Sequence, residues 1–391
     1  MVVQHNMQAA NANRMLNVTT SAQSKSTEKL SSGYRINRAA DDAAGLTISE
    51  KMRKQIRGLD QASTNAQDGV SSVQTAEGAL TEVHSMLQRM NELATQAANG
   101  TNSKDSDRQA IQDEIDQLTT EIDRVSETTK FNETYLLKGD GAEKAHNVNA
   151  HDAGLDGVTL TDKGDTVDVT LKTLNAGDKI SIAGKNYTIG ATTADAQKIV
   201  DAQKVDGKTV TVNGTTYKYK TNQWTNADGS AATVGGGAAG SITIKGGDVV
   251  SDGTKTLTAM KDGANAAGAD GIDDNDSTVI TAGKAYQLQT AEIVKASSIG
   301  TDTAAAVKNG ANADKDATAT FTLNKGTVSY KDALSFNLHV GADADMTNKI
   351  TVNIDSMNSA GLGVKGIKAD TEQDATYAID AIADAISTVS S

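Results

Sequence analysis

Apolar residues recur three and four positions apart along residues 47–99, the spacing that places them on one face of an α-helix. The stripe consists of Met52, Ile56, Leu59, Ala66, Val70, Val73, Leu80, Leu87 and Ala94, widened near its end by Val83, Met90 and Ala97. A repeat sustained over so many turns predicts a long helix with one narrow apolar seam, and such a seam needs a partner helix to cover it. A helix of this length would span roughly 75–80 Å.

A second, shorter helix is predicted over residues 106–126. Its apolar positions step by four and three without a miss, and they are Ile111, Ile115, Leu118, Ile122 and Val125. Between the two helices, Asn99-Gly100 supplies residues that favour the left-handed conformation at a helix end. Ser106 and Gln109 have the spacing of a capping box that opens the next helix. The pattern therefore predicts an antiparallel helical hairpin that needs a third helix.

The third helix is predicted near the C-terminus, from about Asp370 onward. Its stripe is Ile379, Ile382, Ile386 and Val389, and strands over 334–340 and 350–354 precede it. Because each end of the chain leaves an uncovered seam, we expect the two ends to pack together. The stripe is unfinished at Ser391, with no capping residue, which predicts a chain truncated within a helix.

Residues 1–45 form a separate N-terminal arm and connector. The helical stripe over 1–32 is too sparse to hold a helix in water unaided. We expect this arm to be disordered in a monomer and helical only against a partner, and an ordinary frayed terminus is an equally weighted alternative. Gly33 breaks the arm before the charged connector.

The middle of the chain, residues 141–332, changes character to short Val/Ile/Thr/Tyr runs separated by Gly, Asn and Asp. Predicted elements are strands at 167–171, 179–182 and 185–189, hairpin turns at 183–184 and 213–214, one short helix at 194–202, and loops at 225–240 and 260–277. Trp224 lies in a stretch of turn-forming Gly and Asn residues, so it is predicted to be part of a turn. The predicted fold class is therefore multi-domain α plus β: a long antiparallel helical coiled-coil rod from residues 46–140 and 333–391, with an inserted β-rich, surface-exposed variable region of one or two subdomains.

Composition excludes several classes of function. The 391 residues carry a net charge of −13, which argues against a nucleic-acid partner. The chain has no Cys, so disulfides and thiolate metal sites are excluded. The sequence contains no run of about 18 apolar residues, so no membrane span is predicted. The N-terminus lacks the pattern of a cleaved signal peptide.

No catalytic residue, metal ligand or cofactor is predicted. The five His residues are scattered, without a His-Glu-x-x-His pair. Gly235, Gly237 and Gly240 satisfy Gly-x-Gly-x-x-Gly, but they lead into a strand where a dinucleotide site needs a helix N-terminus. The acidic clusters at 270–276 and 312–316 lack the Gly and Glu positions of a calcium loop. An enzyme is therefore not expected.

Five segments carry a family resemblance: residues 29–37 (KLSSGYRIN), 39–46 (AADDAAGL), 87–94 (LQRMNELA), 111–115 (IQDEI) and Phe131-Asn132. With them the chain closely resembles bacterial flagellin over about 1–140 and 333–391. The resemblance implies a secreted, extracellular protein of the flagellum filament, whose terminal helices line an inner tube and whose long helices form an outer tube. The implied partners are other flagellin subunits and the flagellar type III export apparatus. The residues predicted to pack between subunits or between helices are Met52, Ile56, Leu59, Val70, Val73, Leu80, Ile111, Ile115, Leu118, Ile122, Ile379, Ile382 and Ile386.

Flagellins are also ligands of the host's innate immune receptor, Toll-like receptor 5. The resemblance implies that seven residues of this chain contact the receptor: Leu87, Gln88, Arg89, Glu92, Leu93, Gln96 and Glu114. Arg89 and Leu93 lie four apart and share a helix face. On the residues alone, the simpler interpretation is that Leu93 packs inside and that Arg89 and Glu114 form a weak surface ion pair.

Members of the family continue past the point where this sequence stops. We therefore expect this chain to be monomeric or weakly associating and not to grow filaments. The alternative function is an adhesin-like binding module that uses the β-rich middle region.

Overall fold

The computed structural model describes residues 7–101, 106–263, 270–309 and 319–391. The chain divides into two compact units, Met1–Gln74 with Ser335–Asn353 and Thr75–Leu334 with Ile354–Ser391. One long helix, α2 (Ala43–Ala97), contributes residues to both. The domain boundaries expected from the sequence stay a prediction.

The first unit begins with α1 (Met7–Ser32), none of whose residues is buried. Gly33 ends this helix as expected: its φ is +72°, and its N–H donates a 3.0 Å hydrogen bond to Lys29 O. The residues of α1 are thus helical without a packed face, and the expected disorder of this arm in a monomer stays a prediction.

A β-hairpin, β19 (Leu334–His339) and β20 (Lys349–Ile354), with a 3-10 turn η1 (Met346–Asn348) between its strands, packs on α2 in this unit. The hairpin packs against a row of mostly small residues on α2. Asn65 Nδ2 donates a 2.8 Å hydrogen bond to His339 O, and Ala62 is buried. A Cβ atom on Gly58 would lie 2.9 Å from Ala342 Cα, and one on Gly69 would meet Leu338. The hairpin therefore covers a face of α2 that only small residues can form.

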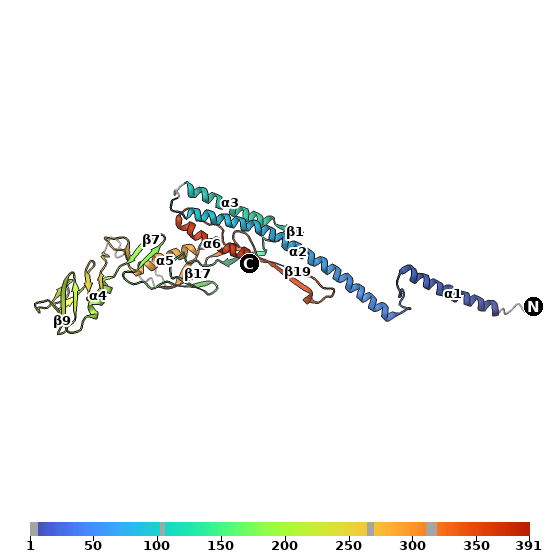
Figure 1. Ribbon diagram of the computed structural model, residues 1–391, viewed down its shortest axis with the longest axis horizontal. Helices are drawn as coiled ribbons and strands as arrows, with labels where there is room; N and C mark the ends of the chain where they lie inside the picture. The colour runs from blue at the N-terminus through green and yellow to red at the C-terminus, as the bar shows by residue number, and fades with distance from the viewer. Residues whose placement is uncertain (1–6, 102–105, 264–269, 310–318) are drawn as a thin grey trace, which may run out of the picture. The chain divides into compact units, whose positions relative to one another are not determined.

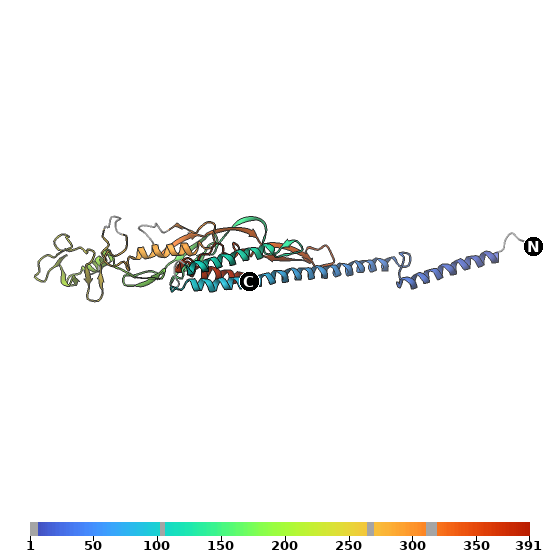
Figure 2. The same ribbon diagram turned by 90° about the horizontal axis from the view of Figure 1, so that it is seen from above.

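In the second unit, the last part of α2 lies beside α3 (Asp107–Thr128) and α6 (Glu372–Ser390) in both views (Figure 1 and Figure 2). Both shorter helices run antiparallel to α2. Their facing side chains are buried, including Leu87, Met90, Ile115, Ile122 and Ile382. The predicted packing of the two chain ends against each other is confirmed.

Two local predictions at the α2–α3 connection are wrong. Neither Asn99 nor Gly100 adopts a positive φ, and Ser106 makes no side-chain capping bond to the start of α3. The buried Arg108 takes over the role of a cap. Its Nε donates a 3.0 Å hydrogen bond to Ala97 O, at the end of α2, so a cationic side chain satisfies the exposed carbonyl end of the helix.

The β-rich middle holds most of the strands of the second unit. They are β1 (Lys130–Phe131), β2 (Thr134–Tyr135), β3 (Asp140–Asn147), β4 (Thr159–Asp162), β5 (Thr166–Thr170), β6 (Lys179–Ile182), β7 (Lys185–Ile189), β8 (Thr209–Val212), β9 (Thr215–Lys220), β10 (Gln223–Thr225), β11 (Thr233–Val234), β12 (Ser241–Ile242), β13 (Val249–Ser251), β14 (Thr256–Thr258), β15 (Val279–Ile280), β16 (Ala306–Asn309), β17 (Thr320–Asn324) and β18 (Thr327–Asp332). The sheets have the orders β10-β9-β8-β13-β14, β16-β17-β5-β4, β15-β7-β6, β18-β3, β11-β12 and β1-β2.

The middle region has two hydrophobic cores. One lies between the sheets of β4–β7 and β17 and helix α5 (Ala282–Ala296), and it also takes in Tyr377 of α6. The other surrounds Trp224, between α4 (Thr193–Ala202) and the sheet of β8–β10 and β13. The predicted hairpin turns at Ala183-Gly184 and Asn213-Gly214 are confirmed, and the residues of both turns have positive φ.

Two predictions for the middle region are wrong. The sequence predicted one helix there, but α5 is a second, because its buried face includes the polar residues Gln289, Thr290 and Glu292 and so hides its apolar period. Trp224 is 1 % exposed on β10 and is a core residue, not part of a turn. Part of the predicted loop at 260–277 and the acidic cluster at 312–316 fall outside the described residues.

Candidate functional site

The predicted receptor contacts separate into a buried and an exposed set. Leu87 and Leu93 are 0 % and 2 % exposed, so both side chains belong to the core of the helical bundle. Gln88, Arg89, Glu92 and Gln96 are exposed on α2, and Glu114 is half-buried on α3. The surface that a partner can reach on these helices is therefore polar and charged.

Arg89 is the centre of this surface. Its Nε donates a 2.9 Å hydrogen bond to Glu114 Oε1 on α3, and its Nη1 donates a 3.1 Å hydrogen bond to Glu92 Oε2 one turn along α2. The hydrogen bond to Glu114, followed by that to Glu92, raises the pKa of the guanidinium above its usual value. Arg89 stays a cation at any physiological pH. The two bonds hold it in place across the helix pair, as the simpler interpretation of the sequence also expected.

The predicted packing residues fall into three groups. Ile111, Ile115, Ile122 and Ile382 are buried in the second unit. Leu80, Leu118, Ile379 and Ile386 are half-buried there. Met52, Ile56, Leu59, Val70 and Val73, all in the first unit, are 43–59 % exposed.

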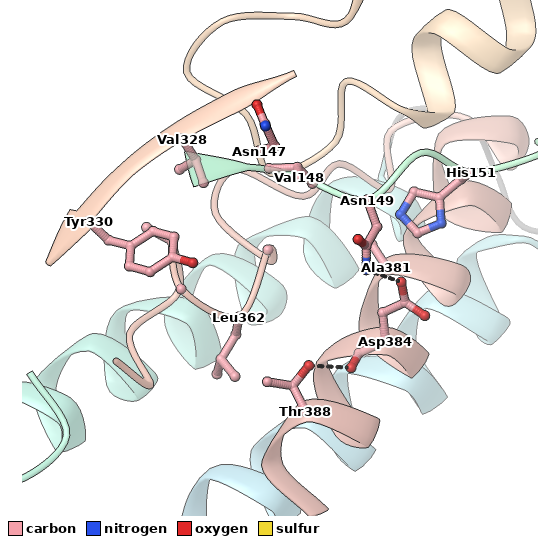
Figure 3. A pocket seen from close by; sticks show the side chains of 13 residues that line it. Asn147, Val148, Asn149, His151, Val328, Tyr330, Leu362, Ala381, Asp384 and Thr388 are labelled. Carbon is pink, nitrogen blue, oxygen red and sulfur yellow. Dashed lines mark hydrogen bonds between the residues drawn. The ribbon is translucent and has the colours of Figure 1, made fainter. Parts of the chain in front are cut away.

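A small pocket of about 180 Å³ lies between the end of β3, the loop at 360–363 and α6 (Figure 3). Its polar groups bond to one another: Asn149 Nδ2 donates to Asp384 Oδ2 at 3.4 Å, and Thr388 Oγ1 donates to Asp384 O at 3.0 Å. His151 is held through its backbone, whose N–H donates to Ser297 Oγ at 3.0 Å. This arrangement offers no nucleophile paired with a base.

The described part of the chain shows neither a metal-binding cluster nor a membrane-spanning helix. No group of three or more His, Asp or Glu side chains there is placed to hold a metal ion. None of the helices in those residues is long and apolar enough to cross a membrane.

Sequence reasoning missed the polar residues that join the distant segments. The buried side chain of Gln112 on α3 donates a 2.9 Å hydrogen bond to Ile367 O and accepts a 2.6 Å hydrogen bond from Ala369 N. Asp123 accepts hydrogen bonds from the backbone and hydroxyl of Ser359. Neither residue lies in an apolar stripe, so periodicity gives no signal for them.

The fold defines a class: an α+β protein whose N-terminal hairpin is closed by a helix from the other end of the chain, with a β-rich insertion between them. Residues 3–142 match the family model described as the bacterial flagellin N-terminal helical region. These residues include all of the α2–α3 hairpin. The N-terminal region of this chain is therefore similar to that of bacterial flagellins.

Curated relatives show the same similarity. The chain is 53 % identical over 192 residues to a flagellin of Clostridium tyrobutyricum, covering 49 % of this chain and 46 % of the relative. It is 60 % identical over 140 residues to a flagellin of Bacillus subtilis, covering 36 % of this chain and 46 % of that protein. The chain thus spans about half the length of the curated relatives it matches. A solved structure of FliC from Burkholderia pseudomallei aligns with 82 % of this chain and 95 % of its own at 18 % identity, with a TM-score of 0.25, too low to compare the folds.

Proposed function

We propose that this chain is a structural, non-enzymatic subunit of a bacterial flagellar filament, exported by the flagellar apparatus and located outside the cell. The flagellin match over residues 3–142 carries the proposal. The packing of α2, α3 and α6 supports it, because the two ends of the chain form one helical bundle, as the resemblance to flagellin implies.

The exposed apolar stripe of the first unit suggests where other subunits bind. Met52, Ile56 and Leu59 project from α2 and are not covered by the β19–β20 hairpin in the described residues. A contiguous apolar surface of this kind is unusual on a monomer and is characteristic of a surface that meets another chain. In a head-to-tail assembly, each copy would present this stripe to a different surface of its neighbour.

Photo-cross-linking tests this proposal without requiring filament growth. A photoreactive amino acid replaces Ile56 in one variant and Gln61, an exposed polar residue of the same helix, in a control. We expect illumination at high protein concentration to give a covalent dimer from position 56 and little from position 61. Equal yields at both positions, or none at either, would contradict a subunit surface at this stripe.

We further propose that Toll-like receptor 5 recognises the surface around Arg89. The proposal draws on the resemblance and on the exposure of Gln88, Arg89 and Glu92. Since Leu87 and Leu93 are buried, their role in this proposal is to hold the helix rather than to touch the receptor.

Binding of the receptor ectodomain to Arg89→Ala and Arg124→Ala tests the second proposal. Arg124 is an exposed, ion-paired arginine on α3 and is the matched control. An interface hot spot at Arg89 predicts about a tenfold loss of affinity for the first variant and almost none for the second. Unchanged affinity in Arg89→Ala would rule out this surface.

A further inference from the structure

The five-stranded sheet around β8 has one face in the core and one face in solvent. Cross-strand pairing puts Val210 opposite Tyr217, Trp224 opposite Tyr219 and Val250 opposite Val212, and these side chains form the Trp224 core. Because side chains alternate along a strand, the residues between them point to the other face. Helix α4 packs on the core side. On the outer face Thr216, Lys218, Lys220 and Thr256 are exposed, Thr211 and Ser251 are half-buried, and Thr225 at one edge is buried.

The outer face carries a row of hydroxyl groups. Thr216 pairs with Thr211, Thr211 with Ser251, and Ser251 with Thr256, so the row crosses four adjacent strands. The hydroxyls of Thr211 and Thr216 are 3.0 Å apart, and Thr256 Oγ1 donates to Ser251 Oγ at 2.8 Å. Ser251 Oγ also donates to Lys255 O and accepts from Gly253 N, so its hydroxyl is already bonded within the sheet. With strands about 4.8 Å apart, the hydroxyls of Thr211, Thr216 and Thr256 give a regular row that keeps lone pairs for a ligand.

Two lysines lie beside this row. Lys218 and Lys220 are exposed on the same face of β9, about 7 Å apart by strand geometry. Neither ammonium group has a carboxylate partner in the part of the chain that the structure describes. The five strands of the sheet contain no Asp or Glu, although the whole chain has a net charge of −13. Carboxylates lie in the turns at the ends of the strands: Asp206 accepts a 3.1 Å hydrogen bond from Thr221 N, and Asp252 accepts hydrogen bonds from the backbone of Thr254 and Lys255.

We propose that this face, defined by Thr211, Thr216, Lys218, Lys220, Ser251 and Thr256, is a binding surface for a sulfated polysaccharide. Unpaired ammonium groups are complementary to anionic groups, and a row of hydroxyls can exchange hydrogen bonds with sugar hydroxyls. Two cations this close together match the closely spaced charges of a sulfated glycan better than a polymer with one carboxylate per disaccharide.

Other polyanions fit the face less well. Nucleic-acid strands are held on protein sheets by aromatic side chains that stack on bases, and here Tyr217, Tyr219 and Trp224 all point into the core. An anionic membrane would favour exposed apolar side chains, and the outer face offers only Val249. The surface lies far in sequence from the flagellin-like ends, so it is independent of the filament proposal.

Binding of the full chain to heparin at low ionic strength tests the inference. The variant is K218Q/K220Q, and the matched control is K198Q/K204Q, which removes the same charge from α4 and the turn directly after it, on the other side of the core. All four residues are exposed, so circular dichroism should show both variants folded. We expect affinity to fall about tenfold or more in K218Q/K220Q and less than about twofold in the control.

Three results would overturn the inference: no heparin binding by the unaltered chain, an equal loss in both variants, or equally tight binding of single-stranded DNA or anionic vesicles. The hydroxyl row is tested by T211V/T216V, which keeps shape and strand propensity. We expect about a threefold weaker affinity for heparin, since the hydrogen bonds lost are to neutral groups. Unchanged affinity would show that the hydroxyl row does not take part in heparin binding.

Discussion

The side-chain oxygen of Gln112 accepts a 2.6 Å hydrogen bond from the backbone N–H of Ala369, 257 residues further along the chain. The same carboxamide donates to Ile367 O, so one side chain of α3 satisfies both a donor and an acceptor of the segment before α6. Ile367 and Ala369 are buried, and neither group can turn to water instead. Gln112 thus fixes the position of the C-terminal segment on the N-terminal hairpin.

We expect Gln112→Ala to lower the free energy of unfolding by about 2–4 kcal/mol, because it leaves two buried backbone groups without partners. Denaturant unfolding monitored by circular dichroism measures this loss. Gln109→Ala is the control, since Gln109 is exposed on the same helix and bonds only to Asp113 among the described residues. A similar, small loss in both variants would show that the bonds of Gln112 contribute little.

Sequence patterns predicted the parts of this fold that large apolar residues determine. Ile111, Ile115 and Ile122 of α3 and Ile382 of α6 are all buried, as expected, because burial of large aliphatic side chains dominates the packing of helices. Contacts such as those of Gln112 could not be predicted, because whether a polar residue is buried depends on a partner far away in sequence.

The face of α2 on which the β19–β20 hairpin packs shows a second limit of prediction from sequence patterns. Gly58, Ala62, Asn65, Gly69 and Ser72 step by four and three, just as an apolar seam does. They lie one position before the more hydrophobic stripe of Leu59, Val70 and Val73, which is exposed in this unit. Small residues have little hydrophobicity, so a search for apolar periods selects the neighbouring stripe. The candidate receptor surface has the same origin: sequence similarity identified it, whereas burial separated Leu87 and Leu93 from its exposed residues.

Two glycines of α2 should respond in opposite directions to substitution by alanine. In Gly58→Ala the new Cβ would lie 2.9 Å from the backbone Cα of Ala342, which cannot rotate away, so we expect the β19–β20 hairpin to loosen. Around Gly78 an added Cβ would meet no atom within 4 Å apart from the neighbouring backbone of α2 itself, so Gly78→Ala should stabilise α2 by up to about 1 kcal/mol.

Hydrogen exchange of the hairpin amides, together with thermal unfolding, distinguishes the two effects. Faster exchange in residues 334–354 is expected for Gly58→Ala alone. If exchange there is unchanged, the hairpin does not depend on close approach to Gly58.

The pH dependence of stability should distinguish two aspartates of the second unit. Burial raises the pKa of Asp380 on α6; His151 lowers it, and Asp152 and Asp384 raise it further. A raised pKa means that the folded state resists ionisation of this carboxyl. Its contribution is therefore favourable below the unfolded pKa of about 3.9 and is lost as the pH rises through the folded pKa. At pH 7 the charge of Asp380 opposes folding.

The pKa of Asp302 is shifted in the opposite direction. The hydrogen bond from Lys365, together with one from the backbone of Ser329, lowers its pKa. Its contribution is present above the unfolded pKa and is lost as the pH falls toward the folded pKa. We therefore expect Asp380→Asn to raise the melting temperature at pH 7 by roughly 1–3 °C and Asp302→Asn to lower it. Both shifts should shrink toward pH 3, where the wild-type carboxyls take up protons. Thermal unfolding of the two variants and the unaltered chain at pH 7 and pH 3 measures these shifts in melting temperature. Shifts of the same sign at pH 7 would show that the surroundings of Asp380 do not disfavour its charge.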